Sequence, residues 1–232
     1  MTSALMKGVS KFRRGYFRRH REKFESLVRH GQNPGALFIT CADSRILPHA
    51  LTHTAPGDLF VLRNVGNMVP AWAPGAECPA VGSAVEYAIG VLGVSHIVVC
   101  GHSHCGACAA LYDDDLGPEL AMTARWLEQG ARVKELILEK AALDEGGLDG
   151  VLQSREKKAH ILRATEKAMV VQHLRNLLTY PGVAPRVEKG ELALHGWHYT
   201  LESGAIESYD PERLAFVPLD RIEPPQRPAL LS

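Results

Sequence analysis

Two short stretches of the chain carry side chains that bind soft metal ions. One reads "LFITCADSR" and contains Cys41, Asp43 and Arg45; the other reads "VVCGHSHCGAC" and contains His102 and Cys105. Thiolate and imidazole are the ligands that zinc prefers, whereas magnesium and calcium prefer oxygen. An H-x-x-C turn lets both of its side chains face one point. We therefore expect a zinc site made of Cys41, His102 and Cys105, with zinc as the cofactor.

Other side chains in or near these stretches also have to be weighed as ligands. His104 competes with His102 because H-x-C is a possible ligand spacing, although a residue two positions on tends to face the opposite way. Cys100 lies inside an apolar run, where a cysteine is most often packed and inert. We assign no partner to Cys78 or Cys108. Five cysteines, an odd number, argue against a disulfide framework in a chain without an export signal.

Asp43 and Arg45 follow Cys41 at the second and fourth positions. A carboxylate so close to a metal is able to act as a fourth ligand, which would close the site and make it structural. Arg45 is instead able to hold that carboxylate in a bidentate pair, which leaves the fourth position free for water. The local spacing leaves both arrangements open.

Apolar runs and helical periodicity indicate the elements that position these residues. They predict strands at 36–40, 58–66 and 95–101, helices at 79–92, 106–112, 118–143 and 154–179, and a terminal strand and hairpin around Ser203 and Gly204. Strands that alternate with helices indicate an α/β fold with a mostly parallel central sheet flanked by helices. Ligands of such sheets lie beyond the carboxyl ends of the strands, where Cys41 and His102 both fall.

Length and composition narrow the class of protein. The 232 residues suffice for one domain, which we divide into an N-terminal helical arm (1–31), a catalytic α/β core (32–210) and a C-terminal extension (211–232). Lys and Arg total 26, as do Asp and Glu, which argues against nucleic-acid binding. No apolar run approaches the roughly 18 residues of a membrane span. The first residues lack the apolar core of a secretory signal, so we expect a cytoplasmic protein.

The arm combines basic residues with an apolar stripe at helical spacing. The stripe consists of Val9, Phe12, Tyr16, Phe17, Phe24 and Leu27. We expect an amphipathic helix that packs on a surface or forms a dimer. A targeting segment and a solvated basic helix are the alternatives; Glu22 and Glu25 interrupt the basic run and count against targeting.

Taken together, "CADSR" and "GHSHCGA" resemble the C-x-D-x-R and H-x-x-C motifs of the β-class carbonic anhydrases. The similarity continues over most of the chain, through "GDLFVLRNVGNMVP", "SAVEYAIGVLGVSHIVVCGHSHCGA" and "LHGWHYTLESGAIESYD". The resemblance implies zinc on Cys41, His102 and Cys105, and a catalytic dyad of Asp43 and Arg45. It also implies reversible hydration of CO2 to bicarbonate by a homodimer or larger homo-oligomer, whose N-terminal helices embrace the partner.

The resemblance further implies a pocket for the substrate. Gln32, Phe60, Tyr87 and Gly106 match the substrate-lining positions of a plant-like subtype in which zinc keeps an open position. Members of another subtype carry a Trp three residues before the first cysteine, as part of an off state that bicarbonate triggers. This chain has Phe38 at that position, so we expect no such inhibition.

Three other functions have to be considered beside this one. A related zinc hydrolase would act on carbon disulfide or carbonyl sulfide, and differs chiefly in access to its pocket. A non-catalytic structural zinc protein results if Asp43 closes the coordination sphere. A thiol-redox or sensor protein would use Cys100, Cys105 and Cys108.

Overall fold

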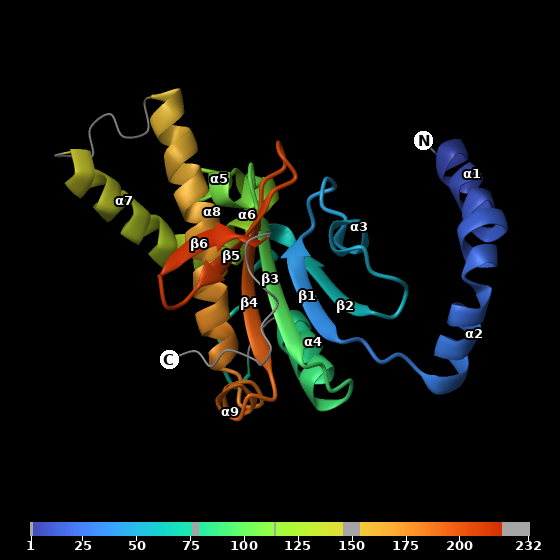
Figure 1. Cartoon of the computed structure of the whole chain (residues 1–232). Helices are drawn as coiled ribbons and strands as arrows, with labels where there is room; N and C mark the ends of the chain where they lie inside the picture. Colours follow the sequence, from blue (N-terminus) through green and yellow to red (C-terminus); the bar gives the residue numbers. More distant parts are fainter. Residues whose placement is uncertain (1, 76–78, 114, 146–153, 220–232) are drawn as a thin grey trace.

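The computed structural model describes residues 2–75, 79–113, 115–145 and 154–219. A six-stranded sheet runs through it in the order β2-β1-β3-β4-β5-β6 (Figure 1). Its strands are β1 (Ala36–Cys41), β2 (Leu59–Asn64), β3 (His96–His102), β4 (Ala193–Tyr199), β5 (Ile206–Asp210) and β6 (Ala215–Pro218). The first four strands pair in parallel, and β5 and β6 are added antiparallel. The expected α/β fold with a mostly parallel sheet is thus confirmed.

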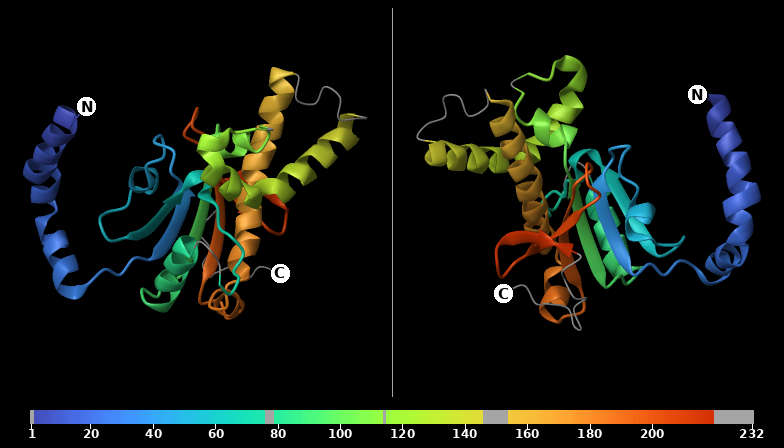
Figure 2. Two further views of the ribbon diagram at one scale, coloured as in Figure 1. Left: turned by 180° about the vertical axis from the view of Figure 1, so that it is seen from behind. Right: turned by 45° about the horizontal axis from the view of Figure 1, so that its top comes forward.

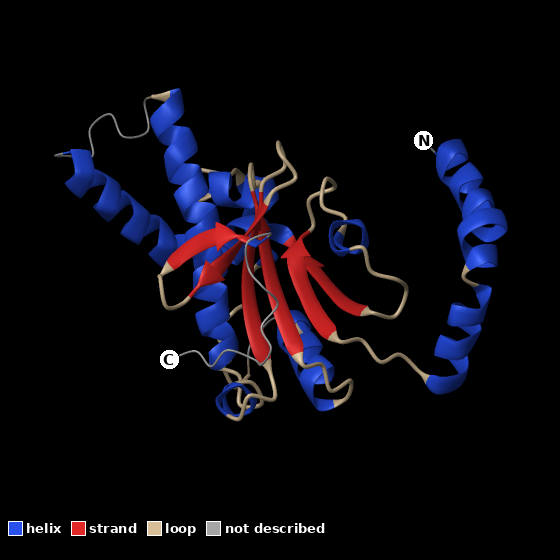
Figure 3. Ribbon diagram, in the orientation of Figure 1, coloured by secondary structure: helices blue, strands red, loops and turns tan. Residues whose placement is uncertain are grey.

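Strands β1 and β3 are apolar on both faces because both lie in the interior of the sheet. Leu37 and Ile39 of β1 pack into a core with α4 (Ala80–Gly90) and α8 (Arg155–Leu178). Figure 3 shows these two helices lying along the sheet. Phe38 packs into a separate cluster with Val98 and Cys100. Because β1 pairs in register with β3, the carboxyl ends of the two strands meet at one edge of the sheet.

The other helical segments are mostly short, and two of the shortest were not expected. Among the described residues, the segments beside α4 and α8 are α1 (Thr2–Phe12), the π-helical η1 (Arg13–Phe17), α2 (Arg21–His30), α3 (Pro48–Thr52), η2 (Val65–Asn67), α5 (Gly106–Ala110), η3 (Pro118–Leu120), α6 (Ala121–Leu127), η4 (Glu128–Gly130), α7 (Ala131–Glu145) and α9 (Ala184–Glu188). The helices α3 and α9 were not predicted, and neither was strand β6. Within the described ranges, no helix combines the length and apolarity that crossing a bilayer requires.

The helical stretch expected at 118–143 is present, but not as one continuous α-helix. Four segments, η3, α6, η4 and α7, occupy this part of the chain. At the end of η4, Gly130 lies so close to Leu111 that a Cβ there would be 2.7 Å from a Leu111 methyl group. Glycine in a helix interior is unfavourable by about 1 kcal/mol relative to alanine, and Gly130 lies where the 3₁₀ turn η4 meets α7.

The helical arm stands apart from the sheet in both orientations (Figures 1 and 2). It is two helices with a bend at His20, where φ is −108° and ψ is 17°, and not one straight helix. Phe17 and Phe24 contact each other across the bend, with ring centroids 5.1 Å apart. All residues of the two helices are exposed or half-buried; Val9 and Phe12 are 61% and 45% exposed. The part of the apolar stripe around Val9 and Phe12 therefore remains open to other contacts, whereas Leu27 packs against Gly57.

Candidate metal centre

Three metal-binding side chains meet at the edge where β1 and β3 end. Cys41 is the last residue of β1, His102 is the last residue of β3, and Cys105 immediately precedes α5. Their ligand atoms all lie within 4.8 Å of one another, and all three residues are buried. The parallel pairing of two adjacent strands, followed by a tight turn into α5, therefore brings together the set that we selected from the sequence.

The orientation of the His102 ring fits a metal ligand. Its Nδ1 donates to the Ser103 carbonyl at 2.8 Å, which leaves the lone pair of Nε2 available. This Nε2 is buried and has no hydrogen-bond partner among the described residues. His104, the competing ligand, lies outside the cluster; it is exposed, has a φ of 56° and pairs with Glu202. Two thiols and one unprotonated imidazole nitrogen form a donor set that suits zinc.

The two thiols hold their protons when no cation is bound. A hydrogen bond with Cys105, together with burial, raises the pKa of Cys41 to about 12. A hydrogen bond with Cys108 is the main reason that the pKa of Cys105 is raised to about 12. A thiol binds a metal as the thiolate. Metal binding to this cluster must therefore displace protons, and metal affinity must rise with pH.

Asp43 is held next to this cluster by Arg45. Its Oδ1 accepts hydrogen bonds from the Arg45 backbone N–H and from Nε, both at 2.9 Å, and its Oδ2 accepts from Nη2 at 2.7 Å. The same Nη2 donates to the His104 carbonyl at 3.0 Å, which ties the two motifs together. The side-chain hydrogen bonds from Arg45 hold the pKa of Asp43 well below its usual range. Asp43 is therefore an ionised, oriented carboxylate at neutral pH.

Two residues at the end of β2 support the cluster and were missed from the sequence. Arg63 donates from Nε to the Cys41 carbonyl at 3.1 Å and from Nη2 to the Asp43 carbonyl at 2.6 Å. The N–H of Gly66 donates to the Cys41 sulfur at 3.4 Å. Gly66 has a φ of +78°, and a Cβ there would lie 2.9 Å from the Cβ of Ala107. A charged residue at the end of an apolar strand was the available signal for Arg63.

A buried carboxylate of α8 lies beneath the turn that carries Cys105. Glu166 is 3% exposed and accepts hydrogen bonds from the Cys105 backbone N–H at 3.2 Å and from Arg163 Nη1 at 2.9 Å. The Nε2 atom of His198 lies 3.1 Å from the same carboxylate. The charge of Glu166 is thus compensated, and its oxygens fix the backbone of the turn. We missed Glu166 because an acidic residue in a long helix usually faces solvent.

Three of the predicted pocket residues lie away from the metal cluster of the same chain. Phe60 pairs with Leu37, four residues before Cys41, which is roughly 13 Å along the strand. Tyr87 contacts Phe60, with ring centroids 5.9 Å apart. Gln32 lies in the connection between α2 and β1 and is exposed. Within one chain, these side chains are near the opposite edge of the sheet.

Two residues of α5 adjoin the cluster. Gly106 follows Cys105 and is exposed, and a Cβ built on it would meet open space. Cys108 is buried in the apolar cluster that also contains Cys41 and Cys105. We assigned no partner to Cys108 from the sequence, although its C-x-x-C spacing to Cys105 was a usable signal. Cys78 lies outside the described residues.

A mostly parallel sheet with two thiols and an imidazole at the carboxyl ends of its strands defines an α/β metal-binding protein. A family model described as carbonic anhydrase matches residues 36–206. A carbonic anhydrase of Pseudomonas aeruginosa is 40% identical over 217 residues, which are 93% of this chain and 90% of that protein. The chain belongs to the β-class carbonic anhydrase family, whose members are lyases.

Solved structures agree with this assignment. The β-carbonic anhydrase CcaA superposes with a TM-score of 0.85 at 37% identity, covering 99% of this chain and 95% of that chain. A tetrameric β-carbonic anhydrase of Sordaria macrospora gives a TM-score of 0.71 at 28% identity, covering 89% of this chain and 96% of that chain. The similarity thus extends over the sheet, the helices and the metal-binding edge.

Proposed function

We propose that this chain is a zinc-dependent carbonic anhydrase that catalyses the reversible hydration of CO2 to bicarbonate and a proton. One observation carries the catalytic role: Arg45 engages both oxygens of Asp43 next to the Cys-His-Cys cluster. A carboxylate held in this way is a poor fourth ligand, because binding a metal would cost it charge-assisted hydrogen bonds. The arrangement therefore favours an open catalytic site over a closed structural one.

Cys41, His102 and Cys105 would hold one zinc ion per subunit. When bound, zinc acidifies a water molecule and so supplies hydroxide near neutral pH, less strongly beside two thiolates than beside three imidazoles. The Ser103 carbonyl fixes the His102 tautomer, so Nε2 and not Nδ1 would bind the zinc. We expect activity to climb towards alkaline pH, in keeping with this ligand set.

Asp43 would accept a hydrogen bond from the reacting water and so orient its lone pair towards the carbon of CO2. Arg45 keeps Asp43 ionised and fixes its direction, because it is itself anchored on the His104 carbonyl. Arg63 holds the backbone of the same loop through the Asp43 carbonyl. A carboxylate placed this way has little conformational freedom to lose when the substrate arrives.

Gln32, Phe60, Tyr87 and Gly106 are the residues that we propose for the substrate side. Gly106 keeps the space beside Cys105 open, since it has no side chain. The other three lie near the opposite edge of the sheet of their own chain, so a second copy would have to supply them. Phe60 and Tyr87 would offer apolar walls to an uncharged gas, and the Gln32 amide would donate to developing charge on oxygen. These positions favour the plant-like, open-zinc subtype.

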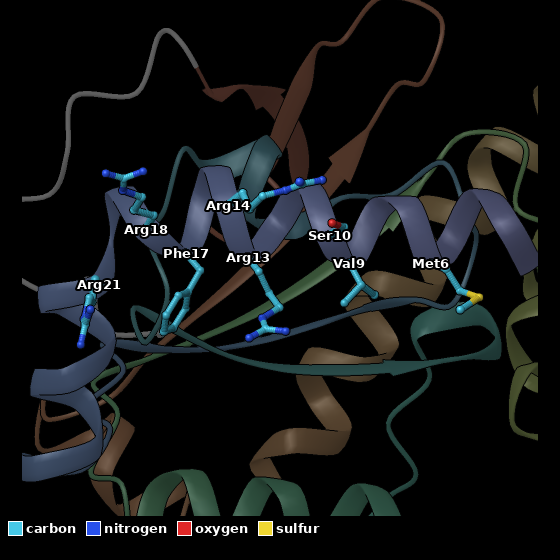
Figure 4. Close-up of a pocket in the computed structure, with 8 residues that line it drawn as sticks. All are labelled: Met6, Val9, Ser10, Arg13, Arg14, Phe17, Arg18 and Arg21. Atoms are coloured by element: carbon cyan, nitrogen blue, oxygen red, sulfur yellow. The ribbon is translucent and has the colours of Figure 1, made fainter.

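A homodimer, or a larger homo-oligomer, is the proposed assembly, with the arm packed on the partner. Figure 4 shows the arm face on which Met6, Val9 and Phe17 lie among arginine side chains. Residues 1–21 contain seven Lys and Arg and no acidic residue, whereas the whole chain is neutral, so the remainder carries compensating negative charge. The arm of one copy thus complements the body of another. The similarity to a tetrameric enzyme supports the same proposal.

We propose the cytoplasm as the location of this assembly. The thiols of Cys41 and Cys105 bind a metal only when they are not oxidised to disulfides, and the cytoplasm keeps thiols reduced. The finer division of the chain into an arm at 1–31, a core at 32–210 and an extension at 211–232 is part of the same proposal. Strand β6 lies within that extension and pairs with β5.

Stopped-flow measurement of CO2 hydration by the zinc-loaded protein, from about pH 6.5 to pH 9, tests the function. We expect saturable turnover that rises with pH. Asp43→Asn should retain zinc and lose about 100- to 10,000-fold in turnover, because a neutral amide is a weaker hydrogen-bond acceptor than a carboxylate and cannot form the charged pair with Arg45. Full zinc content with no hydration at any pH would instead identify a structural zinc protein. Turnover of carbonyl sulfide or carbon disulfide in place of CO2 would identify the related hydrolase.

A further inference from the structure

A second sulfur lies directly beside one of the metal ligands, on the first turn of α5. Cys105 is the residue that caps this helix, and Cys108 is the third residue inside it. The Ala109 N–H donates to the Cys105 carbonyl at 3.0 Å, so the turn between the two cysteines is closed. The side chain of a capping residue lies over the third helical position. This geometry directs the Cys105 side chain towards Cys108, and both residues are buried in one apolar cluster.

Cys108 has no part in the proposed reaction. It lies outside the set of ligand atoms that are within 4.8 Å of one another, which comprises Cys41, His102 and Cys105. It is nevertheless packed in the same apolar cluster and is 3% exposed. Cys108 is thus a buried thiol beside a metal ligand, and it is placed to attack the Cys105 sulfur if that sulfur becomes oxidised.

Cys100 provides a contrast within the same segment. It is buried on the sheet with Phe38 and Val98, in a different cluster from the metal ligands. Its thiol donates to the Gly101 carbonyl, with a sulfur-to-oxygen distance of 3.6 Å. Burial raises the pKa of Cys100 to about 12. Cys100 is therefore not placed to pair with Cys105, whereas Cys108, on the first turn of α5, is.

The C-x-x-C spacing also meets the geometric demands of a disulfide. Disulfides join residues whose Cα atoms are about 4.4 to 6.8 Å apart, and the rise and radius of a helix place Cα atoms three residues apart at about 5 Å. The residues between the cysteines are Gly106 and Ala107, which are small. Gly106, the neighbour of Cys105, is exposed, and a Cβ on it would meet open space, so this is the side from which a small oxidant would enter.

We infer that Cys105 and Cys108 form a reversible disulfide when hydrogen peroxide reaches the site, and that this oxidation removes a ligand from zinc. The inference rests on the proposed function for the zinc and for an opening that admits small molecules. Peroxide is similar in size to the CO2 and water that the reaction requires. With Cys105 oxidised, Cys41 and His102 are two ligands of the original three, too few to retain zinc.

The oxidation is balanced in two steps. The Cys105 thiolate attacks one oxygen of hydrogen peroxide, the O–O bond breaks, and hydroxide leaves, which forms a sulfenic acid on Cys105. The Cys108 thiol then attacks the Cys105 sulfur, the S–O bond breaks, and water leaves with the thiol proton. The two sulfurs together lose two electrons, and the peroxide gains both. Reduction by an external dithiol reverses the process and regenerates both thiols.

Zinc-loaded wild type, Cys108→Ala and the matched control Cys100→Ala test the inference after treatment with hydrogen peroxide. Three quantities are measured: zinc released to a chelating dye, the cysteine state by differential alkylation and mass mapping, and CO2 hydration. We expect the wild type and Cys100→Ala to lose about 2 Da at the Cys105–Cys108 pair and to release their zinc. Dithiothreitol and added zinc should then restore zinc content and activity.

Cys108→Ala should behave differently. Without the second thiol, Cys105 should proceed to sulfinic acid, and the reductant should restore neither zinc content nor activity. The inference is overturned if the wild type retains its zinc and free thiols, if the bond maps to Cys41 and Cys105, or if Cys108→Ala recovers as fully as the wild type. An untreated wild type without CO2 hydration contradicts the proposed function instead, while the zinc and mass measurements still decide the disulfide.

Discussion

Both carboxylate oxygens of Asp43 accept hydrogen bonds from the guanidinium of Arg45, at 2.9 and 2.7 Å. Asp43 and Arg45 are only two residues apart in the sequence. Arg45 is itself held by a distant segment, because it also donates to the carbonyl of His104, 59 residues further on. The carboxylate that acts on the reacting water and the turn that carries two metal ligands are thus connected through one guanidinium. This connection explains why a loop residue keeps a fixed direction although Arg45 is 51% exposed.

Replacement of Arg45 by Lys should lower turnover without removing zinc. An ammonium keeps the positive charge, but it cannot reproduce the two parallel hydrogen bonds of the guanidinium, so Asp43 gains freedom to rotate or to bind the metal. We expect kcat to fall by about 100-fold or more, with zinc content unchanged. Arg132→Lys is the matched control, since Arg132 forms an exposed pair with Glu135 on α7. An Arg45→Lys variant with wild-type kcat would exclude a positioning role for Arg45.

Gly66→Ala should weaken both the fold and the metal site. The backbone of Gly66 has a φ of +78°, and an added Cβ would lie 2.9 Å from the Cβ of Ala107. Relief of the contact would also move the N–H that donates to Cys41. We expect the free energy of unfolding to fall by about 1 to 3 kcal/mol and zinc affinity to decrease. Chemical denaturation and competition with a zinc chelator measure the two effects.

Gly90→Ala is the control for that substitution. Gly90 is the last residue of α4, and a Cβ there would meet open space. Alanine is favoured over glycine in helices, so the unfolding free energy should stay the same or rise by up to about 1 kcal/mol. If Gly66→Ala were as stable as this control, the tight approach to Ala107 would not matter.

His173 should make the fold less stable as the pH falls. It lies on α8, is fully buried, and its Nδ1 accepts the Val69 N–H at 3.2 Å. Burial lowers the pKa of His173 to about 4, whereas the unfolded chain titrates near 6.5. Between these two pKa values, His173 is protonated in the unfolded state but stays neutral in the folded state. The free energy of unfolding should therefore decrease by about 1.4 kcal/mol per pH unit, from about pH 6.5 down to pH 4.

A His173→Gln variant isolates this contribution, because an amide oxygen is able to accept the Val69 N–H but does not titrate. Urea denaturation at several pH values should show a shallower decrease for His173→Gln than for the wild type. His160→Gln, at an exposed position of α8, should keep the wild-type slope. Other groups that titrate in this range affect all three proteins alike and cancel. Equal slopes for His173→Gln and the wild type would contradict the prediction.

Bicarbonate should inhibit the enzyme without cooperativity. Phe38 occupies the position where another subtype has the Trp of its bicarbonate-triggered off state, and a phenyl ring has no N–H to donate to an anion. Phe38 is 1% exposed and packs against Trp197, with ring centroids 5.9 Å apart. Initial rates of hydration at increasing bicarbonate should follow a simple hyperbolic decrease. A sigmoidal curve would place the enzyme in the other subtype.

Much of the fold was readable from the sequence because its inner strands are strongly patterned. The apolar runs at 36–40 and 95–101 fall within one or two residues of β1 and β3, which are buried on both faces. The helices α3 and α9 were missed because five residues are too short to show a helical period. The close approach of Gly130 to Leu111 joins two separate segments, so no local pattern reveals it.

The metal ligands could be predicted because each follows an apolar run, and parallel strands bring such ends together. Residues that support the ligands could not be predicted in the same way. Arg63 and Glu166 act through backbone groups of distant segments, so their roles exist only after β2 and α8 have packed. Cys108 is the exception, because its spacing to Cys105 was visible throughout.

The apolar stripe of the arm should be needed for assembly and not for the fold of one chain. Val9 and Phe12 are 61% and 45% exposed, so charges there cost a single chain little, whereas burial against a partner would make them costly. Val9→Glu with Phe12→Glu should weaken the dimer at least about tenfold, as measured by sedimentation equilibrium, with an unchanged far-ultraviolet spectrum. Leu214→Glu, which alters a still more exposed residue between β5 and β6, should leave the dimer intact. A monomeric wild type, or a doubly charged variant that still dimerises normally, would show that the arm does not join the copies.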